Sequence, residues 1–129
     1  MINTGILNPQ ILALLARVRH TNALVIADRG FPFWPQIETV DLSVVDDLPT
    51  VLQLIAAVRA NHHFTQAFQA KEFLKNNPPA ARAKFAAALK GVPTKFEPHA
   101  EFKKRVPHAI GLIRTGDTTR YANTILISG

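Results

Sequence analysis

The sequence contains no cysteine and no long apolar run, and both absences narrow what the protein can be. Without cysteine there are no disulfides, no thiolate zinc sites and no cysteine nucleophiles. No unbroken apolar run exceeds the six residues 11–16, whereas a membrane helix requires about 20. The amino terminus also lacks the basic region and apolar stretch of a secretory signal. We therefore expect a cytoplasmic protein that does not contact the membrane.

Recognisable catalytic and metal-binding motifs are missing as well. The chain has no glycine-rich phosphate loop, no nucleophile elbow and no zinc signature. Two adjacent histidines, His62 and His63, cannot both face one metal ion on a helix, and no third ligand is near them in the sequence. We expect no metal site.

The composition is that of an ordinary globular protein, with 47% hydrophobic and 19% charged residues in 129 positions. This length predicts one domain over residues 1–129. The net charge of +6 is regional, because residues 71–105 hold nine basic and three acidic side chains, and nine minus three equals the whole excess. Such a region could bind nucleic acid, but stacking aromatics are not interleaved with it. A solvated helical surface is the favoured interpretation, and a nucleic-acid partner is not expected.

The pattern of apolar residues predicts alternating helices and strands. Asn8-Pro9 is typical of a helix start, and apolar spacing extends that helix to about Val18. The acids of Asp46-Asp47-Leu48-Pro49 are expected to cap a second helix. The further expected helices cover 71–76, 80–90 and a short turn at 98–103, and the expected strands cover 23–27, 38–44, 64–70, 94–97, 108–114 and 124–128. This order predicts an α/β fold: one three-layer α/β/α domain with a mostly parallel mixed sheet.

Polar residues flank the first expected strand, and they are the first candidates for chemistry. His20 lies just before it and Asp28 just after it, where α/β proteins place their active sites. They form a candidate acid/base pair, yet a five-residue strand spans about 16 Å. The two can meet only if the His20 loop folds back or if another subunit supplies one of them.

Further polar clusters occur in the second half of the chain. His99 and Lys103 lie four residues apart on an expected helical turn, and Tyr121 and Asn123 end a polar loop. Carboxylate, amide, phenol and imidazole groups suit a neutral ligand with many hydroxyls. The aromatics of Gly30-Phe31-Pro32-Phe33-Trp34-Pro35 are interpreted as core or interface packing, with a platform under a sugar ring as the alternative.

Several of these segments together resemble one family. They are Gly5-Ile6-Leu7-Asn8, Arg19-His20-Thr21, Val25-Ile26-Ala27-Asp28, His99 to Lys103, and Ile113-Arg114-Thr115-Gly116 leading to Tyr121-Ala122-Asn123. In order and register they are similar to the D-ribose pyranase and L-fucose mutarotase family over nearly the whole chain. The resemblance implies a cofactor-independent sugar-ring isomerase that forms rings of subunits, commonly decamers of two pentamers, with sites at subunit interfaces.

The resemblance also implies roles for particular residues. His20 would be the proton donor, and Asp28, His99, Lys103, Tyr121 and Asn123 would bind substrate. The histidine at 99 and the Tyr-Ala-Asn tripeptide look like the ribose branch. The alternatives are a mutarotase for fucose or another sugar, and a non-catalytic sugar-binding or basic nucleic-acid-binding module on the same fold.

One departure from the family pattern bears on the site. Arg29 stands where the family usually has a small residue. Its cation could pair with Asp28 and occupy that carboxylate.

Overall fold

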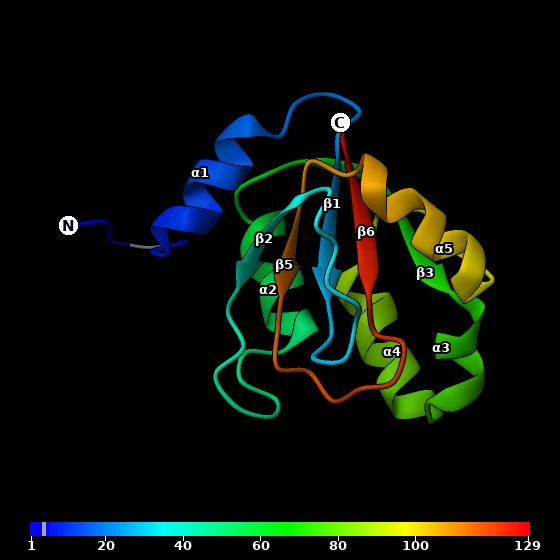
Figure 1. The fold of residues 1–129 in the computed structure, drawn as a ribbon. Coiled ribbons are helices and arrows are strands. Elements are labelled where there is room, and N and C mark those ends of the chain that lie inside the picture. Colours follow the sequence, from blue (N-terminus) through cyan, green and yellow to red (C-terminus); the bar gives the residue numbers. More distant parts are fainter. Residues whose placement is uncertain (4) are drawn as a thin grey trace.

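Six strands form one mixed sheet in the computed structural model, which describes residues 1–3 and 5–129. The strands are β1 (Ala23–Ala27), β2 (Glu38–Asp41), β3 (Phe64–Ala70), β4 (Thr94–Glu97), β5 (Gly111–Arg114) and β6 (Thr124–Ser128). They are ordered β2-β5-β1-β6-β3-β4, and β6 alone runs against the other described strands (Figure 1). The helices are α1 (Pro9–Arg17), α2 (Val51–Arg59), α3 (Lys71–Asn76), α4 (Pro79–Ala88) and α5 (His99–Arg105), and η1 (Val106–His108) is a 3₁₀ turn.

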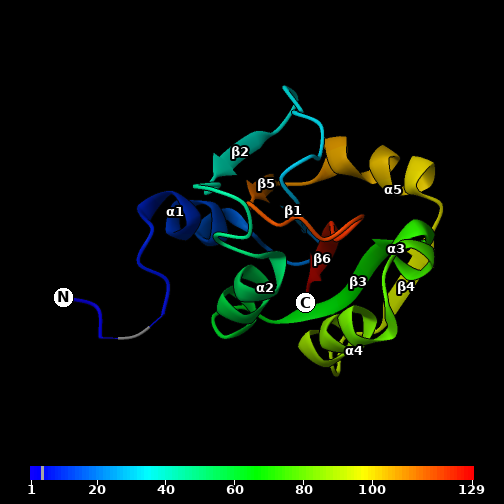
Figure 2. The same ribbon diagram turned by 90° about the horizontal axis from the view of Figure 1, so that it is seen from below.

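Helices cover both faces of the sheet, so the predicted three-layer α/β/α architecture is confirmed. Figure 2 shows α1, α2 and α4 along one face and α5 across the other. Successive residues of β1 point to opposite sides, as strand geometry requires. Leu24 and Ile26 join the core under α1, α2 and α4, while Val25 and Ala27 join the core under α5.

Most element boundaries agree with the sequence predictions, because the local signals act as expected. The Asn8 side chain accepts a hydrogen bond from the Ile11 N–H at the start of α1. The ambiguous segment 64–76 is a strand followed by a helix, as predicted. Gly91 follows α4 with φ +83°, a conformation that glycine adopts without strain.

Three predicted boundaries are wrong by three residues or more, and the helix predicted at 80–90 ends at Ala88. The second helix is capped by Thr50, which forms a capping box with Gln53, because Asp46 and Asp47 bind other loops instead. Strand β2 ends at Asp41 rather than Val44. Strand β5 begins at Gly111 because the 3₁₀ turn occupies residues 106–108.

In the described part of the chain, none of the helices has the length and hydropathy needed to cross a bilayer.

Candidate active site

The carboxyl end of β1 brings Asp28 and Asn123 together. Because β6 is antiparallel to β1 and Ile26 lies opposite Thr124, the start of β6 lies beside the end of β1, and Asn123 is a near neighbour of Asp28. The Asp28 N–H donates to Asn123 Oδ1 at 2.8 Å, and Asn123 Nδ2 donates to Asp28 Oδ2 at 3.2 Å. Asn123 therefore fixes both the backbone and the carboxylate of Asp28.

Asp28 is also held by its own loop. Its Oδ1 accepts a hydrogen bond from the Gly30 N–H at 3.0 Å. Burial raises the pKa of Asp28 above its usual value, although the hydrogen bonds from Gly30, Phe31 and Asn123 favour the charged form. The site thus contains an oriented carboxyl group whose proton is held more tightly than usual.

His99 is the first residue of α5, which follows β4. Because β4 runs parallel to β1, His99 lies at the same edge of the sheet as Asp28. Its backbone N–H donates to both carboxylate oxygens of Glu72, at 3.1 and 3.2 Å. The imidazole packs edge-on to Tyr121, with ring centroids 5.0 Å apart. Burial and the Lys103 cation lower the pKa of His99, while Glu72 opposes this effect. The imidazole is therefore neutral at neutral pH.

The Nε2 atom of His99 is buried and has no hydrogen-bond partner among the described residues. A buried polar atom without a partner is uncommon, and at a cavity wall it is available to a ligand. A sugar hydroxyl could either donate to this nitrogen or accept from it, depending on the tautomer.

These side chains line one cavity of about 240 Å³. Its walls are Asp28, Gly30, Phe31, Pro32, His99, Arg120, Tyr121 and Asn123. Tyr121 has φ +54°, an uncommon conformation for a side chain other than glycine, asparagine or aspartate. Four of the six predicted site residues thus meet in one cavity, which presents a carboxyl, an amide, a phenol and an imidazole.

Lys103 lines the adjacent groove rather than this cavity. That groove, of about 490 Å³, is bounded by Pro32, Phe33, Trp34, Lys103, Lys104 and Pro107. Pro32 lines both spaces. The ammonium group of Lys103 acts on the site through its charge, which lowers the pKa of His99.

His20 lies at the opposite end of β1, so the expected His20–Asp28 pair does not form within one chain. The turn that carries it is closed by a hydrogen bond from the Arg19 N–H to Asn22 Oδ1 and by one from the Thr21 N–H to Ser128 O. His20 is exposed on this turn. The loop does not fold back along the strand, which spans roughly 16 Å.

An arginine that the sequence analysis did not select holds the Asp28 loop. Arg114, at the end of β5, donates to the carbonyl oxygens of Asp28, Arg29 and Pro32 at 3.2–3.4 Å. Its side chain is 11% exposed. A signal was present in the sequence, since Arg114 is a charged residue at the carboxyl end of an expected strand. Arg29 itself bonds Asp46 at 2.7 Å and does not pair with Asp28.

The described residues contain no group of three or more histidine, cysteine, aspartate or glutamate side chains that could hold a metal ion.

Comparison with known proteins identifies the family. The model of the RbsD / FucU transport protein family matches residues 1–129. The chain belongs to this family. Among RbsD / FucU relatives, a D-ribose pyranase of Laribacter hongkongensis is 39% identical over 129 residues, covering 100% of this chain and 98% of the relative. A D-ribose pyranase of Geobacillus kaustophilus is also 39% identical, with coverage of 100% and 94%.

Solved RbsD / FucU structures share the fold. Bacillus subtilis RbsD in complex with D-ribose has a TM-score of 0.92 and 31% identity, covering 100% of this chain and 98% of that one. A fucose mutarotase from Streptococcus pneumoniae in complex with L-fucose has a TM-score of 0.76 and 18% identity, with coverage of 95% and 92%. The family resemblance predicted from the sequence is confirmed.

Proposed function

We propose that this chain is a sugar-ring isomerase that exchanges D-ribose between its pyranose and furanose forms without a cofactor. The observation that carries this proposal is the convergence of Asp28, His99, Tyr121 and Asn123 on one cavity. Relatives that match the full chain are named D-ribose pyranase. The neutral imidazole and hydrogen-bonding groups suit sugar hydroxyls better than they suit an anion.

The reaction requires two proton transfers. When the ring opens, the bond from the anomeric carbon to the ring oxygen breaks, the ring oxygen gains a proton, and the anomeric hydroxyl loses one. The product is the open-chain aldehyde, and closure through a different hydroxyl gives the other ring size. An imidazole can give or take a proton near neutrality.

We assign His20 as the proton donor to the ring oxygen. Asp28 and His99 face the cavity and are the groups able to accept the anomeric proton, while Tyr121 and Asn123 bind hydroxyls. Lys103 acts on the site from the adjacent groove. The positive φ of Thr21, +70°, supports a functional role for the His20 turn, since such strain in a β-branched residue is rare.

Because β1 separates His20 from Asp28, we propose that the site is completed by His20 of a second subunit. The assembly would be a ring, with a decamer of two pentamers as the expected form in the cytoplasm. Exposed apolar side chains on the loops support an interface: Phe33, Val44, Val45 and Leu48 are each at least half exposed. In each subunit, residues 1–129 would act as one sugar-binding unit.

The test is the rate of exchange between D-ribose ring forms, measured by magnetisation-transfer NMR with L-fucose as the comparison sugar. We expect acceleration for D-ribose by the wild type and its loss in Asn123→Leu, a variant that keeps the branched side chain but has no hydrogen-bonding groups. Faster exchange of L-fucose than of D-ribose would assign the fucose branch. Sugar binding without faster exchange would indicate a sensor, and salt-sensitive binding to DNA or RNA would indicate a basic binding module.

A further inference from the structure

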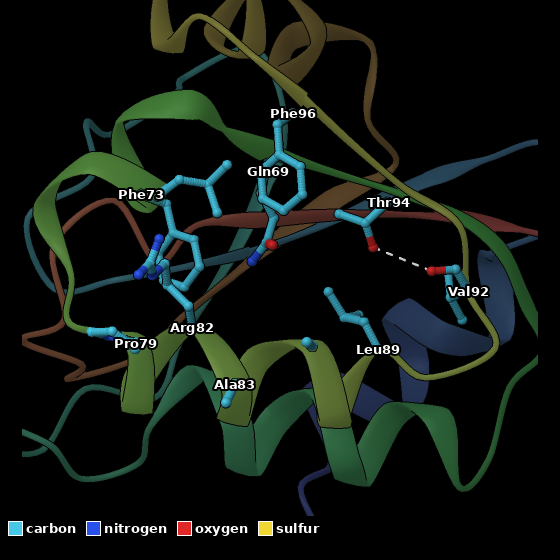
Figure 3. A pocket seen from close by; sticks show the side chains of 11 residues that line it. Gln69, Phe73, Pro79, Arg82, Ala83, Leu89, Val92, Thr94 and Phe96 are labelled. Atoms are coloured by element: carbon cyan, nitrogen blue, oxygen red, sulfur yellow. Dashed lines mark hydrogen bonds between the residues drawn. The ribbon is translucent and has the colours of Figure 1, made fainter.

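A second cavity lies on the face of the sheet that α4 covers, and it shares no residue with the sugar cavity. It has a volume of about 500 Å³, within the range of small-molecule sites. Figure 3 shows it between the helix α4 and the strands β3 and β4, of which β4 is the edge strand. Phe73, Leu89 and Phe96 supply much of its apolar wall.

One cation lines this cavity among the described residues. Arg82 extends from α4 beside Phe73 (Figure 3). Its Nε atom is buried and has no hydrogen-bond partner in the described part of the chain. Arginine keeps its charge in proteins, and its N–H groups suit a planar carboxylate. An anionic ligand would therefore supply a partner that the fold does not.

The side-chain donors of the sheet wall already bond to the protein. Gln69, which is 1% exposed, donates through Nε2 to Thr124 Oγ1, and Thr94 Oγ1 donates to Val92 O. Arg82 is therefore the group on the wall best able to bind a charged ligand. A single guanidinium in an apolar wall fits a monocarboxylate better than a strongly hydrated phosphate dianion.

The surrounding charge also favours an anion. The acidic side chains of residues 71–105 are used elsewhere: Glu97 pairs with Arg105, Glu101 pairs with Lys104, and Glu72 accepts from the His99 N–H. Within the described residues, no ion pair forms for the cations Lys71, Lys75, Arg82, Lys90 and Lys95 of the same segment. Their combined potential attracts negative ligands toward this side of the molecule.

We propose that this cavity binds a small carboxylate with an apolar body, whose carboxylate pairs with Arg82 and whose apolar part covers Phe73, Leu89 and Phe96. This site is independent of the sugar cavity and of the proposed isomerase activity. Its ligand class differs accordingly, since a sugar has neither the negative charge nor the apolar surface that this wall complements.

Calorimetric titration of the full chain at low salt tests the proposal, with hexanoate, 1-hexanol and hexylammonium as probes. We expect hexanoate to bind about tenfold more tightly than 1-hexanol, since a hydrogen bond to a charged group contributes at least that factor. Hexylammonium should bind most weakly. NMR shift changes should include Leu89 and Phe96 and leave Asn123 unaffected.

Three variants on one helix make the result specific. Arg82→Gln should abolish the preference for hexanoate over 1-hexanol, and Ala86→Leu, at an exposed position on the wall, should weaken both by narrowing the cavity. Lys84→Gln removes the same charge from α4 outside this cavity, and its preference for hexanoate should stay within about twofold of the wild type. The proposal is overturned if the folded wild type shows no saturable hexanoate binding, if hexanoate and 1-hexanol bind equally, or if either cavity variant binds as the wild type does.

Discussion

Replacing Asn123 with aspartate tests whether this amide holds Asp28 in its working state. The substitution preserves the side-chain shape and the acceptor for the Asp28 N–H, but it removes the Nδ2 donor that lies 3.2 Å from Asp28 Oδ2. A hydrogen bond to a charged group contributes about 1.5–3 kcal/mol, so we expect a loss of roughly 10- to 150-fold in the rate of sugar-ring exchange at pH 7.5. The new carboxylate also repels Asp28 at close range.

The pH dependence of that loss identifies its cause. Two carboxyl groups in contact cannot both ionise easily, so the pair holds a proton to higher pH than Asp28 does alone. A protonated carboxyl can donate a hydrogen bond again. The ratio of variant to wild-type rate, measured by magnetisation-transfer NMR, should therefore rise as the pH falls from 7.5 to 5. An Asn123→Asp protein with wild-type activity at pH 7.5, or with a ratio independent of pH, would refute the role assigned to Asn123.

Three other predictions concern the surroundings of the site. Arg114→Gln should raise the KM for sugar roughly tenfold with unchanged circular dichroism, because the Asp28 loop loses its carbonyl contacts. Gly116→Ala should destabilise the fold by about 2 kcal/mol, seen as a melting temperature lower by roughly 6 °C, because a Cβ atom would overlap backbone atoms of residues 45 and 48. The NMR titration midpoint of His99 should lie below 6.5, rise in Lys103→Gln and fall further in Glu72→Gln.

Each of these has a control or a contradicting result. Arg29→Gln removes a nearby exposed guanidinium that bonds Asp46, so its KM should stay within about twofold of the wild type. Equal effects of the Arg29 and Arg114 variants would contradict the assignment of Arg114 to the loop. An unchanged melting temperature in Gly116→Ala would mean that the 45–48 loop moves aside freely. A His99 midpoint at or above 6.5 would mean that the ring is more solvated than its packing indicates.

The sequence predicted the helices and strands well because the decisive signals are local. Asn8-Pro9 at a helix start acts within one turn of chain, and Gly91 turns the chain three residues after α4 ends. The second helix start was misassigned for the same reason, since Asp46 and Asp47 look like caps locally. Their carboxylates bind Arg29 and Thr118, which lie 17 and 71 residues away.

The arrangement of the site could not be predicted from local sequence patterns, because it depends on the order of the strands in the sheet. Asp28 and Asn123 meet only because β6 lies antiparallel beside β1. Helical spacing predicted that His99 and Lys103 lie on one face of a helix. In the structure, His99 lines the sugar cavity and Lys103 lines the adjacent groove, while Pro32 lines both. The sequence did reveal the distance between His20 and Asp28, because strand length alone sets it.

The most direct test of a sugar site shared between two subunits is ring exchange of D-ribose by mixed assemblies of His20→Ala and Asp28→Asn chains. Each variant alone should be inactive. A co-expressed one-to-one mixture should recover about one quarter of the wild-type rate, because a quarter of randomly formed interfaces join an intact Asp28 to an intact His20. No recovery in folded mixed assemblies, alongside an active wild type treated in the same way, would contradict the shared site, and an inactive wild type would contradict the isomerase itself.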